Sequence, residues 1–428
     1  MHRITQIAIT NMVVLNGGDG AIMQGTIEIL RKAFGEDCRF VVFASDPVAS
    51  ARAYPETEIH ETLGLAASRA RWEQLRFIGG LSRRLRALRY RFATRLAAHG
   101  VMAALLLLPK KDRISARLYM SSDLIVSGGG TYLKDQYGIR SQYLDYEFTL
   151  SFGKPLAFFT QSIGPLKIAQ NKALIGRSFR GAGIILVRDE PSEKCVRDAA
   201  KRNVPIRRFP DAAFALVDKD KIEGGRMQAK ETREKMRVVV SVREWQHFAS
   251  KPNTEGMRAY RQSIAAAVAW LLEAGADVTF MSSCQGIGEY DDDSAEVDRI
   301  VNLLEIEYRD AVTIRRDFVR YDDLIEELAS FDLCIGTRMH MCILSLCAGT
   351  PALPVSYEFK TRELFGRLQL SDRVTDIETI EPVAFVNNLE NFLADMPRLA
   401  DSVFDSVLAL RDEAYLAGDA IREALAKK

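Results

Sequence analysis

The sequence predicts an α/β protein built from two doubly wound domains. Short apolar runs rich in Val, Ile and Phe alternate with amphipathic stretches of helical period. This alternation is typical of a parallel sheet that is covered by helices on both faces. The series of runs starts again after a highly charged segment, and a chain of 428 residues exceeds what one hydrophobic core usually serves.

The first domain is expected over residues 1–218. Its strands are predicted at residues 6–15, 40–44, 123–127, 155–161 and 184–187, with a short strand before Pro210. The opening run is interrupted by Gln6, Thr10 and Asn11, and no small-residue cleavage site follows it. We therefore interpret this run as a strand and not as a signal peptide.

The second domain is expected over residues 236–400. Its strands are predicted at residues 237–242, 277–281, 312–314, 333–335 and 351–355. Residues 219–235 are predicted to be a linker, because they are mostly charged, contain a Gly-Gly pair and offer almost nothing to bury. Residues 401–428 are predicted to form a C-terminal helix that packs back on the first domain.

Composition narrows the classes of partner and compartment. The formal net charge of +1 gives no global reason to expect nucleic acid as a partner. Six scattered cysteines, none in a CxxC pair, indicate reduced thiols rather than a disulfide framework or a zinc site. The longest apolar run, residues 101–108, is far shorter than the roughly 20 residues that cross a bilayer. We expect a cytoplasmic protein that is soluble or at most peripheral to a membrane.

One segment, residues 69–117, departs from the α/β plan. Residues 69–95 carry nine arginines and one glutamate, arranged around a helical stripe of Leu81, Leu85, Leu88, Phe92 and Leu96. The simpler interpretation is a helix that packs this stripe on its own domain and keeps its arginines in water. The alternative is peripheral attachment to an anionic membrane surface, at the inner face of the membrane.

The most informative motif is Gly336-Thr337-Arg338-Met339-His340. It follows an apolar run and precedes a segment of small residues, so it predicts a strand, a tight turn and a helix capped by Thr337. Arg338 and His340 then fall where backbone N–H groups and the helix dipole favour anions. The alternative is that Arg338 pairs with a neighbouring carboxylate and His340 is satisfied inside the core.

Other polar residues are expected on the same rim. Arg243 ends a buried strand, a position that solvation explains poorly, and it is expected to project into the same crevice as Arg338. Two guanidinium groups there suit a carboxylate and a phosphate. Tyr357 and Lys360 follow the last predicted strand and are placed on this rim as well.

Three glycine loops end strands of the first domain: Asn16-Gly17-Gly18-Asp19-Gly20, Ser127-Gly128-Gly129-Gly130 and Gln161-Ser162-Ile163-Gly164-Pro165. Their spacing matches neither a dinucleotide fingerprint nor a phosphate-binding P-loop. Asp19 is suited to accepting hydrogen bonds from sugar hydroxyls or to acting as a base. Its alternative is a helix N-cap or an ordinary turn.

Taken in order, these motifs, together with Val187-Arg188-Asp189, Pro210-Asp211, Ser241-Val242-Arg243 and Gly349-Thr350-Pro351, resemble the polysaccharide pyruvyl transferase family. The resemblance spans about residues 10–370. It implies two Rossmann-like domains facing a cleft, as in GT-B glycosyltransferases. It also implies phosphoenolpyruvate as the donor and a ketal-linked pyruvate on a sugar of a cell-surface glycan or exopolysaccharide.

The predicted roles follow from the motifs and the resemblance. His340, Arg338 and Asp19 are expected to be catalytic, and the donor is expected to contact Arg243, Arg338, Met339, His340, Tyr357 and Lys360. The acceptor, a sugar or a lipid-linked oligosaccharide, is expected to contact Asn16, Gly18, Asp19, Gly129, Gly130 and Gln161. No cofactor or metal is required, because cations are already supplied by side chains.

Two other functions remain open at this stage. A GT-B glycosyltransferase would use a nucleotide sugar, with Glu358 or Lys360 recognising the ribose or diphosphate. A non-catalytic scaffold in glycan export would depend instead on the arginines of the basic helix, such as Arg83, Arg84 and Arg91.

Overall fold

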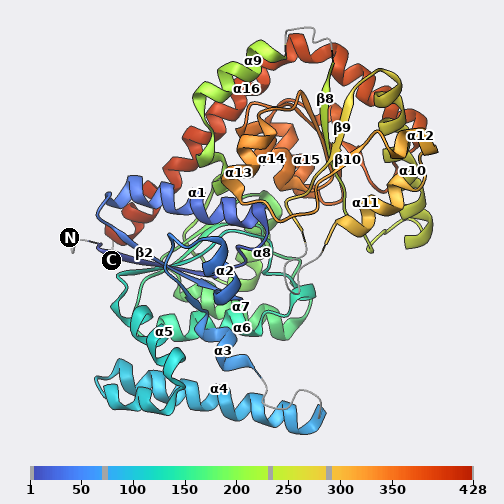
Figure 1. Cartoon of the computed structure of the whole chain (residues 1–428). Helices are drawn as coiled ribbons and strands as arrows, with labels where there is room; N and C mark the ends of the chain where they lie inside the picture. Colours follow the sequence, from blue (N-terminus) through green and yellow to red (C-terminus); the bar gives the residue numbers. More distant parts are fainter. Residues whose placement is uncertain (1–3, 70–75, 230–234, 286–291, 427–428) are drawn as a thin grey trace. The chain divides into compact units, whose positions relative to one another are not determined.

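The computed structural model describes residues 4–69, 76–229, 235–285 and 292–426, which form two compact units (Figure 1). Unit 1 comprises Met1–Val14, Ile22–Ala215 and Glu413–Lys428. Unit 2 comprises Leu15–Ala21 and Leu216–Asp412. The chain therefore enters unit 2 once near its N-terminus, through the first glycine loop, before it builds most of unit 1.

Unit 1 is built on a seven-stranded parallel sheet with the order β3-β2-β1-β4-β5-β6-β7. Its central strands are buried on both faces, which is why they read as continuous apolar runs. The strands are β1 (Gln6–Met12), β2 (Arg39–Ala44), β3 (Ile59–Glu61), β4 (Leu124–Ser127), β5 (Leu156–Gln161), β6 (Ile184–Val187) and β7 (Ile206–Arg208).

Helices complete unit 1. They are α1 (Gly17–Phe34, whose first turn belongs to unit 2), α2 (Pro47–Ala53), α3 (Leu63–Ser68), α4 (Arg76–Ala98), α5 (Lys110–Ser121), α6 (Arg140–Ser151), α7 (Ala169–Gly181), α8 (Glu190–Ala200) and the end of α16 (Pro382–Ala426). Three 3₁₀ segments, η1 (Met102–Leu107), η2 (Asp135–Tyr137) and η3 (Ala212–Leu216), connect them.

Unit 2 repeats the plan with a six-stranded parallel sheet in the order β10-β9-β8-β11-β12-β13. Its strands are β8 (Arg237–Ser241), β9 (Asp277–Phe280), β10 (Thr313–Ile314), β11 (Leu333–Gly336), β12 (Ala352–Ser356) and β13 (Thr375–Asp376). Its helices are α9 (Lys219–Gln228), α10 (Asn253–Glu273), α11 (Ser294–Val301), α12 (Ile306–Arg309), α13 (Tyr321–Leu328), α14 (Met339–Cys347), α15 (Phe359–Arg367) and most of α16, with η4 at Ser371–Arg373.

Both sheets have the doubly wound order of the Rossmann fold, in which the first strand lies beside the fourth. The expectation of two doubly wound α/β domains is therefore confirmed. The sequence reasoning missed β3 and β13, which have three and two residues and carry too few apolar positions to be recognised. A cleft shared by the two sheets stays a prediction.

The segment 219–235 differs from the expected linker. Residues 219–228 form α9, where Asp218 caps the first turn and Ile222 is fully buried. Gly225 packs so closely against the backbone of Gly349 that a β-carbon would lie 2.0 Å from its carbonyl oxygen. Residues 230–234 lie outside the described part of the chain.

The last turns of α16 belong to unit 1. The Tyr415 hydroxyl donates to the carbonyl of Ala215, and the Arg422 guanidinium donates to the carbonyl of Ala33. Gly418 lies against Ile29 and Ala33 of α1, at a distance where a larger side chain would collide. These contacts tie the C-terminal turns to the first Rossmann unit.

The basic segment is helical, but its apolar stripe faces water, whereas the simpler interpretation packed the stripe on its own domain. Along α4, Leu81, Leu85, Leu88 and Phe92 are exposed, and a different face of the helix is buried. The expectation that this stripe packs on its own domain is therefore wrong for these four residues. Among the described residues, no helix has the length and apolar character needed to cross a bilayer.

Candidate functional site

The candidate site lies at the carboxyl end of the sheet of unit 2, where β8 and β11 are neighbours. This is the topological switch point of the sheet, at which ligands of doubly wound proteins usually bind. Gly336 of β11 is in register with Ser241 of β8, and the Thr337 N–H donates to the Ser241 carbonyl at 2.8 Å. The loops that carry Arg243 and Arg338 therefore leave the sheet side by side.

A buried tyrosine of α10 joins these two loops. The Tyr260 hydroxyl is hydrogen-bonded to Thr337 Oγ1 at 2.8 Å, and the Arg243 N–H donates to the same hydroxyl at 3.4 Å. Tyr260 is fully buried, and burial raises the pKa of its phenol above its ordinary value. The phenol stays protonated and acts as a fixed link between the ends of β8 and β11.

The turn after β11 differs in one detail from the expectation. The N-cap of α14 is Arg338 and not Thr337, whose hydroxyl is engaged by Tyr260. Met339 is buried at the start of the helix, and His340, which follows it, is partly exposed. The helix ends at Cys347, and Gly349 then adopts a positive φ of 81°, as expected for a glycine that terminates a helix.

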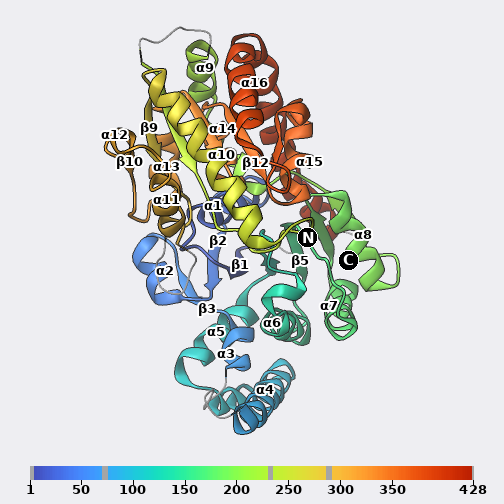
Figure 2. The same ribbon diagram turned by 90° about the vertical axis from the view of Figure 1, so that its right-hand side faces the viewer.

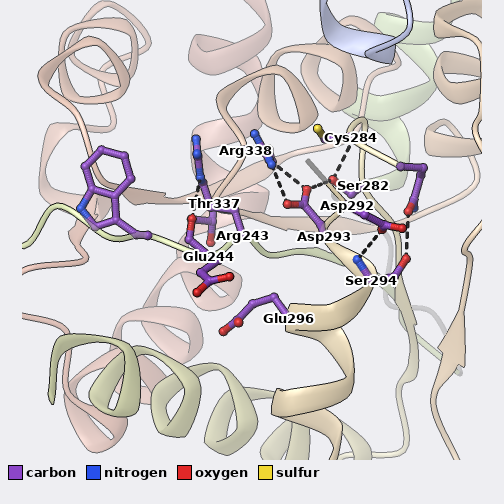
Figure 3. Close-up of polar contacts among 12 residues, drawn as sticks. Arg243, Glu244, Ser282, Cys284, Asp292, Asp293, Ser294, Glu296, Thr337 and Arg338 are labelled. Carbon is purple, nitrogen blue, oxygen red and sulfur yellow. Dashed lines mark hydrogen bonds and ion pairs between the residues drawn. The ribbon is translucent and has the colours of Figure 1, made fainter. Parts of the chain in front are cut away.

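Arg338 forms a two-point ion pair with Asp293. Its Nε and Nη2 atoms donate to the two carboxylate oxygens at 2.9 and 2.6 Å, and both side chains are largely buried (Figure 3). Burial alone would lower the pKa of Arg338, but the charge and hydrogen bonds of Asp293 raise it overall. The alternative in which Arg338 pairs with a carboxylate is therefore the observed one, and the pair engages two of the five guanidinium N–H donors.

Asp293 is itself held in place by the loop after β9. The Ser282 hydroxyl donates to the same carboxylate, and the Ser282 oxygen accepts a hydrogen bond from the Cys284 N–H at 3.1 Å. The Asp293 N–H donates to the Cys284 carbonyl at 3.2 Å. Figure 3 shows the carboxylate between Ser282 and Arg338. The orientation of Arg338 is thus set by the residue that precedes α11, in the segment between β9 and α11.

Arg243 lies over a pair of aromatic rings. Its guanidinium carbon is 4.4 Å from the centre of the Tyr357 ring and 5.4 Å from that of Trp245. The two rings are 4.7 Å apart. This stacking holds the planar guanidinium without neutralising it. Within the described residues, no carboxylate forms an ion pair with Arg243, whose Nε donates weakly to the Glu244 carbonyl at 3.3 Å.

Three positively charged side chains of the site act on the Tyr357 phenol. Burial raises the pKa of its phenol, but Lys360, Arg243 and Arg338 lower it more strongly, and the net shift is downward. Lys360 also forms an ion pair with Glu358 at 3.0 Å. Arg243, Arg338, Tyr357 and Lys360, which were predicted to share one rim, are therefore brought together in unit 2.

The first glycine loop contributes to this same site and not to unit 1. Asn16 caps the first turn of α1, since its Oδ1 accepts from the Gly18 N–H at 2.9 Å and its carbonyl accepts from the Gly20 N–H. The Gly17 N–H donates to the Ser283 carbonyl at 2.8 Å. A β-carbon on Gly18 would lie 2.5 Å from the β-carbon of His340.

Three of the predicted acceptor residues therefore lie in a different unit from the one expected. Asn16, Gly18 and Asp19 were assigned to the first domain, but Leu15–Ala21 form part of unit 2. Asp19 is not the cap of α1, because Asn16 fills that role. Asp19 lies in the first turn of α1, partly exposed, one residue beyond the glycine that contacts His340.

The remaining predicted acceptor residues lie at the carboxyl ends of β4 and β5 in unit 1. Gly129 lies so close to Ile22 and Arg188 that a β-carbon would collide with both, and Gly130 has a φ of 136°. Gln161 is buried, and its amide donates to the Gly128 carbonyl at 2.8 Å and to the Tyr132 hydroxyl at 2.6 Å. Gln161 thus stabilises the conformation of the glycine loop through these hydrogen bonds.

Sequence reasoning missed three residues of the site: Asp293, Tyr260 and Trp245. Tyr260 lies within a long amphipathic helix, where an aromatic side chain is usually core. Asp293 belongs to an acidic run that follows the strand at residues 277–281. That position, after a strand end and before a helix, is the signal that could have identified it.

Comparison with known proteins identifies relatives by sequence. A family model for polysaccharide pyruvyl transferase matches residues 16–358. The amylovoran biosynthesis protein AmsJ of Erwinia amylovora is 23% identical over 299 residues, which cover 67% of this chain and 69% of AmsJ. The matched region contains every residue of the candidate site except Lys360.

Solved structures with the same fold are more distant in sequence. HepE of Anabaena, solved in complex with UDP-glucose, superposes with a TM-score of 0.57 at 12% identity and covers 99% of this chain and 100% of its own. Sucrose-phosphate synthase of Thermosynechococcus elongatus gives 0.55 at 14% identity, covering 99% and 100%. Trehalose-6-phosphate synthase of Burkholderia multivorans gives 0.56 at 12% identity, covering 99% of each chain. The fold is therefore that of the GT-B glycosyltransferases.

Proposed function

The chain belongs to the polysaccharide pyruvyl transferase family and is a glycan-modifying transferase, and from this premise we propose that it transfers pyruvate from phosphoenolpyruvate to a sugar of a cell-surface or exopolysaccharide glycan. The product is a ketal, and phosphate is released. AmsJ, a relative by sequence, is described as an amylovoran biosynthesis protein, which supports a role in glycan assembly.

One observation carries the proposal: Arg243 and Arg338 follow neighbouring strand ends at the switch point of a Rossmann sheet, and Arg243 stacks on Tyr357. Burial raises the pKa of the Tyr357 phenol, but Lys360, Arg243 and Arg338 lower it, so three positive charges act on this one ring. Asp293 and Glu358 compensate two of them, and Arg243 keeps its charge available. A small acid with a carboxylate and a phosphate fits such a site.

The reaction needs one proton donor and the attack of two hydroxyls. The methylene carbon of the donor takes a proton, its C2 becomes cationic, and one sugar hydroxyl attacks C2. The bond between C2 and the phosphate oxygen breaks, and a second hydroxyl closes the ketal. The two hydroxyl protons end on the new methyl group and on phosphate, so the atoms balance.

Roles can be assigned to side chains of unit 2. Arg243 anchors the donor through bonds to its phosphate or carboxylate, because it is held by stacking and keeps its charge. Arg338, oriented by Asp293, stabilises the charge that develops as phosphate leaves. His340 transfers the proton, and Asp19, on the turn that contacts His340, activates the acceptor hydroxyl.

The remaining features of the proposal concern partners. The acceptor is a sugar or a lipid-linked oligosaccharide, and Gly129 and Gly130 of unit 1 are among the residues proposed to contact it. The reaction uses phosphoenolpyruvate as a co-substrate, with no cofactor and no metal, in the cytoplasm.

The competing proposal is a glycosyltransferase that uses a nucleotide sugar. It would need Glu358 or Lys360 for the ribose and diphosphate, and these two side chains pair with each other at 3.0 Å. Isothermal titration calorimetry separates the proposals, with phosphoenolpyruvate compared against UDP- and GDP-sugars. We expect saturable binding of phosphoenolpyruvate that is lost in Arg243→Ala and kept in Arg258→Ala, an exposed arginine of α10. Saturable binding of a nucleotide sugar alone would overturn the choice of donor.

A further inference from the structure

The outer face of α4 carries a row of large apolar side chains in water. Leu81, Leu85, Leu88 and Phe92 are 60%, 58%, 56% and 59% exposed. At about 100° per residue these four positions fall within about 60° of one another around the helix. A soluble domain rarely presents four such side chains in one line without covering them.

The opposite face of α4 already supplies the packing that holds the helix on unit 1. Ala87, Tyr90, Ala93 and Ala97 are buried there, and the Tyr90 hydroxyl donates to the buried carboxylate of Asp112 on α5. The exposed row is therefore not a core face that failed to pack. Figure 1 and Figure 2 both show α4 as the outermost helix of unit 1, beyond α3 and α5.

Further apolar side chains are exposed on the segments that follow α4. Val101, Leu106 and Leu107 on or beside η1 and Ile114 on α5 are each 45% exposed or more. The segment η1 packs directly against α4. Most of the large apolar side chains that are exposed in the described part of unit 1 therefore lie on or beside α4, η1 and α5.

The exposed row is bordered by positive charge. Helix α4 contains seven arginines and no acidic residue. By helical position, Arg84 and Arg95 lie on one side of the row and Arg89 on the other. In the described part of the chain, no carboxylate forms an ion pair with these three arginines. Arg86 and Arg91 differ, because they pair with Asp112 and Glu147.

These charges repel one another in the free protein. Arg140, at the start of α6, is exposed beside α4, and loss of hydration together with the nearby Arg83, Arg91 and Arg84 lowers the pKa of Arg140. An anionic partner would relieve this repulsion. A partner that matches this face is apolar along the row of exposed side chains and negatively charged on both sides of that row.

We propose that this face of α4 binds the surface of an anionic lipid bilayer, with the helix axis in the plane of the membrane. The four apolar side chains enter the boundary between headgroups and acyl chains, and the flanking arginines reach the lipid phosphates. A bilayer supplies both parts of the required chemistry along the whole helix. It also places the transferase where lipid-linked glycans are found, although the binding itself does not depend on the transfer reaction.

The test is flotation of the full-length protein with vesicles, in the absence of donor and acceptor. One vesicle is phosphatidylcholine alone, and the other contains one-third phosphatidylglycerol. We expect binding to the anionic vesicle that weakens as salt is raised. Leu85→Gln/Leu88→Gln should abolish binding, and Arg84→Gln/Arg89→Gln/Arg95→Gln should weaken it about fivefold for each charge removed.

Matched variants keep the test specific. Val48→Gln/Ile168→Gln removes two apolar side chains of unit 1 that are 63% and 51% exposed, and Arg177→Gln/Arg258→Gln removes two exposed arginines elsewhere. Both should bind vesicles like the wild type. All substituted positions are exposed, and the thermal melt of each variant checks that it folds.

The contradicting results are equally specific. Absence of wild-type binding to the anionic vesicle, or equal binding by Leu85→Gln/Leu88→Gln, overturns the proposal. So does self-association through this face, seen as a wild-type dimer that the same double variant converts to a monomer without any vesicle binding. Transfer to a soluble acceptor is measured separately, so failure of membrane binding is distinct from failure of the proposed reaction.

Discussion

Gly18 and His340 are in direct contact within unit 2, and the contact leaves no room for a side chain on Gly18. A β-carbon there would lie 2.5 Å from Cβ, 2.6 Å from Cγ and 2.7 Å from Nδ1 of His340. The two residues are more than 300 positions apart in the sequence, and Gly17 is fastened beside them through the Ser283 carbonyl. The first glycine loop therefore fixes the position of the imidazole.

Gly18→Ala is predicted to impair turnover through the position of His340. Helix propensity alone would favour alanine in the first turn of α1 by about 1 kcal/mol, so a loss reports the collision. We expect kcat to fall at least tenfold, which is about 1.4 kcal/mol. Gly224→Ala in α9, where a β-carbon meets nothing within 4 Å, serves as the control. Unchanged kcat in Gly18→Ala would show that the contact does not set the reactive geometry.

His340→Gln is predicted to reduce kcat by about 10²–10⁴-fold, the usual contribution of a general acid or base. His340→Ala should behave in the same way, and both variants should melt like the wild type. The matched control is His99→Gln, which changes an exposed histidine of unit 1. Wild-type rates in either His340 variant would remove this imidazole from the mechanism.

Asp293→Asn is predicted to lower kcat about tenfold, because Arg338, which stabilises the charge on the leaving phosphate, loses the partner that orients it. Stability should fall by about 1–3 kcal/mol, since a buried charged hydrogen bond is lost. Asp298→Asn breaks the exposed pair with Arg316 and should change neither quantity measurably. A drop in stability with an unchanged kcat would restrict Asp293 to a structural role.

Asp145 is predicted to make the stability of unit 1 depend on pH. Burial raises the pKa of this carboxyl to about 6, although hydrogen bonds from Thr10, Tyr119 and Gly64 oppose the shift. The unfolded value is about 3.9, so between these values the folded state holds more protons than the unfolded state. The stabilisation from this group is full below pH about 4 and is lost as pH rises to about 6, by about 2–3 kcal/mol.

Urea denaturation of the wild type and Asp145→Asn over this pH range checks the prediction. The difference in unfolding free energy between the two proteins should change by that amount, because the variant lacks the titrating group while all other carboxyls are shared. Parallel curves for the two proteins would contradict it.

The strand positions could be predicted from the sequence because a strand buried in a parallel sheet is a continuous apolar run. Arg243, Arg338 and Tyr357 were found for a related reason, since each follows such a run. The pairing of Asp293 with Arg338 could not be predicted, because the two residues follow different strands. The sequence around each residue does not determine the order of those strands in the sheet.

The orientation of α4 shows a second limit. The periodicity of its leucines predicts an amphipathic helix, but the buried face consists mainly of alanines and Tyr90. Hydrophobicity alone favours the leucine row as the core face. The close approach of neighbouring helices selects the small residues instead, and that selection depends on tertiary packing.

The most direct measurement of the central claim follows phosphate release and acceptor mass together, in one reaction that contains phosphoenolpyruvate and a panel of glycan acceptors. The account predicts one phosphate released for each acceptor that gains the mass of a pyruvyl ketal, with both signals lost in His340→Gln. A sugar gained from a nucleotide donor, or no gain from phosphoenolpyruvate with any acceptor, would contradict it.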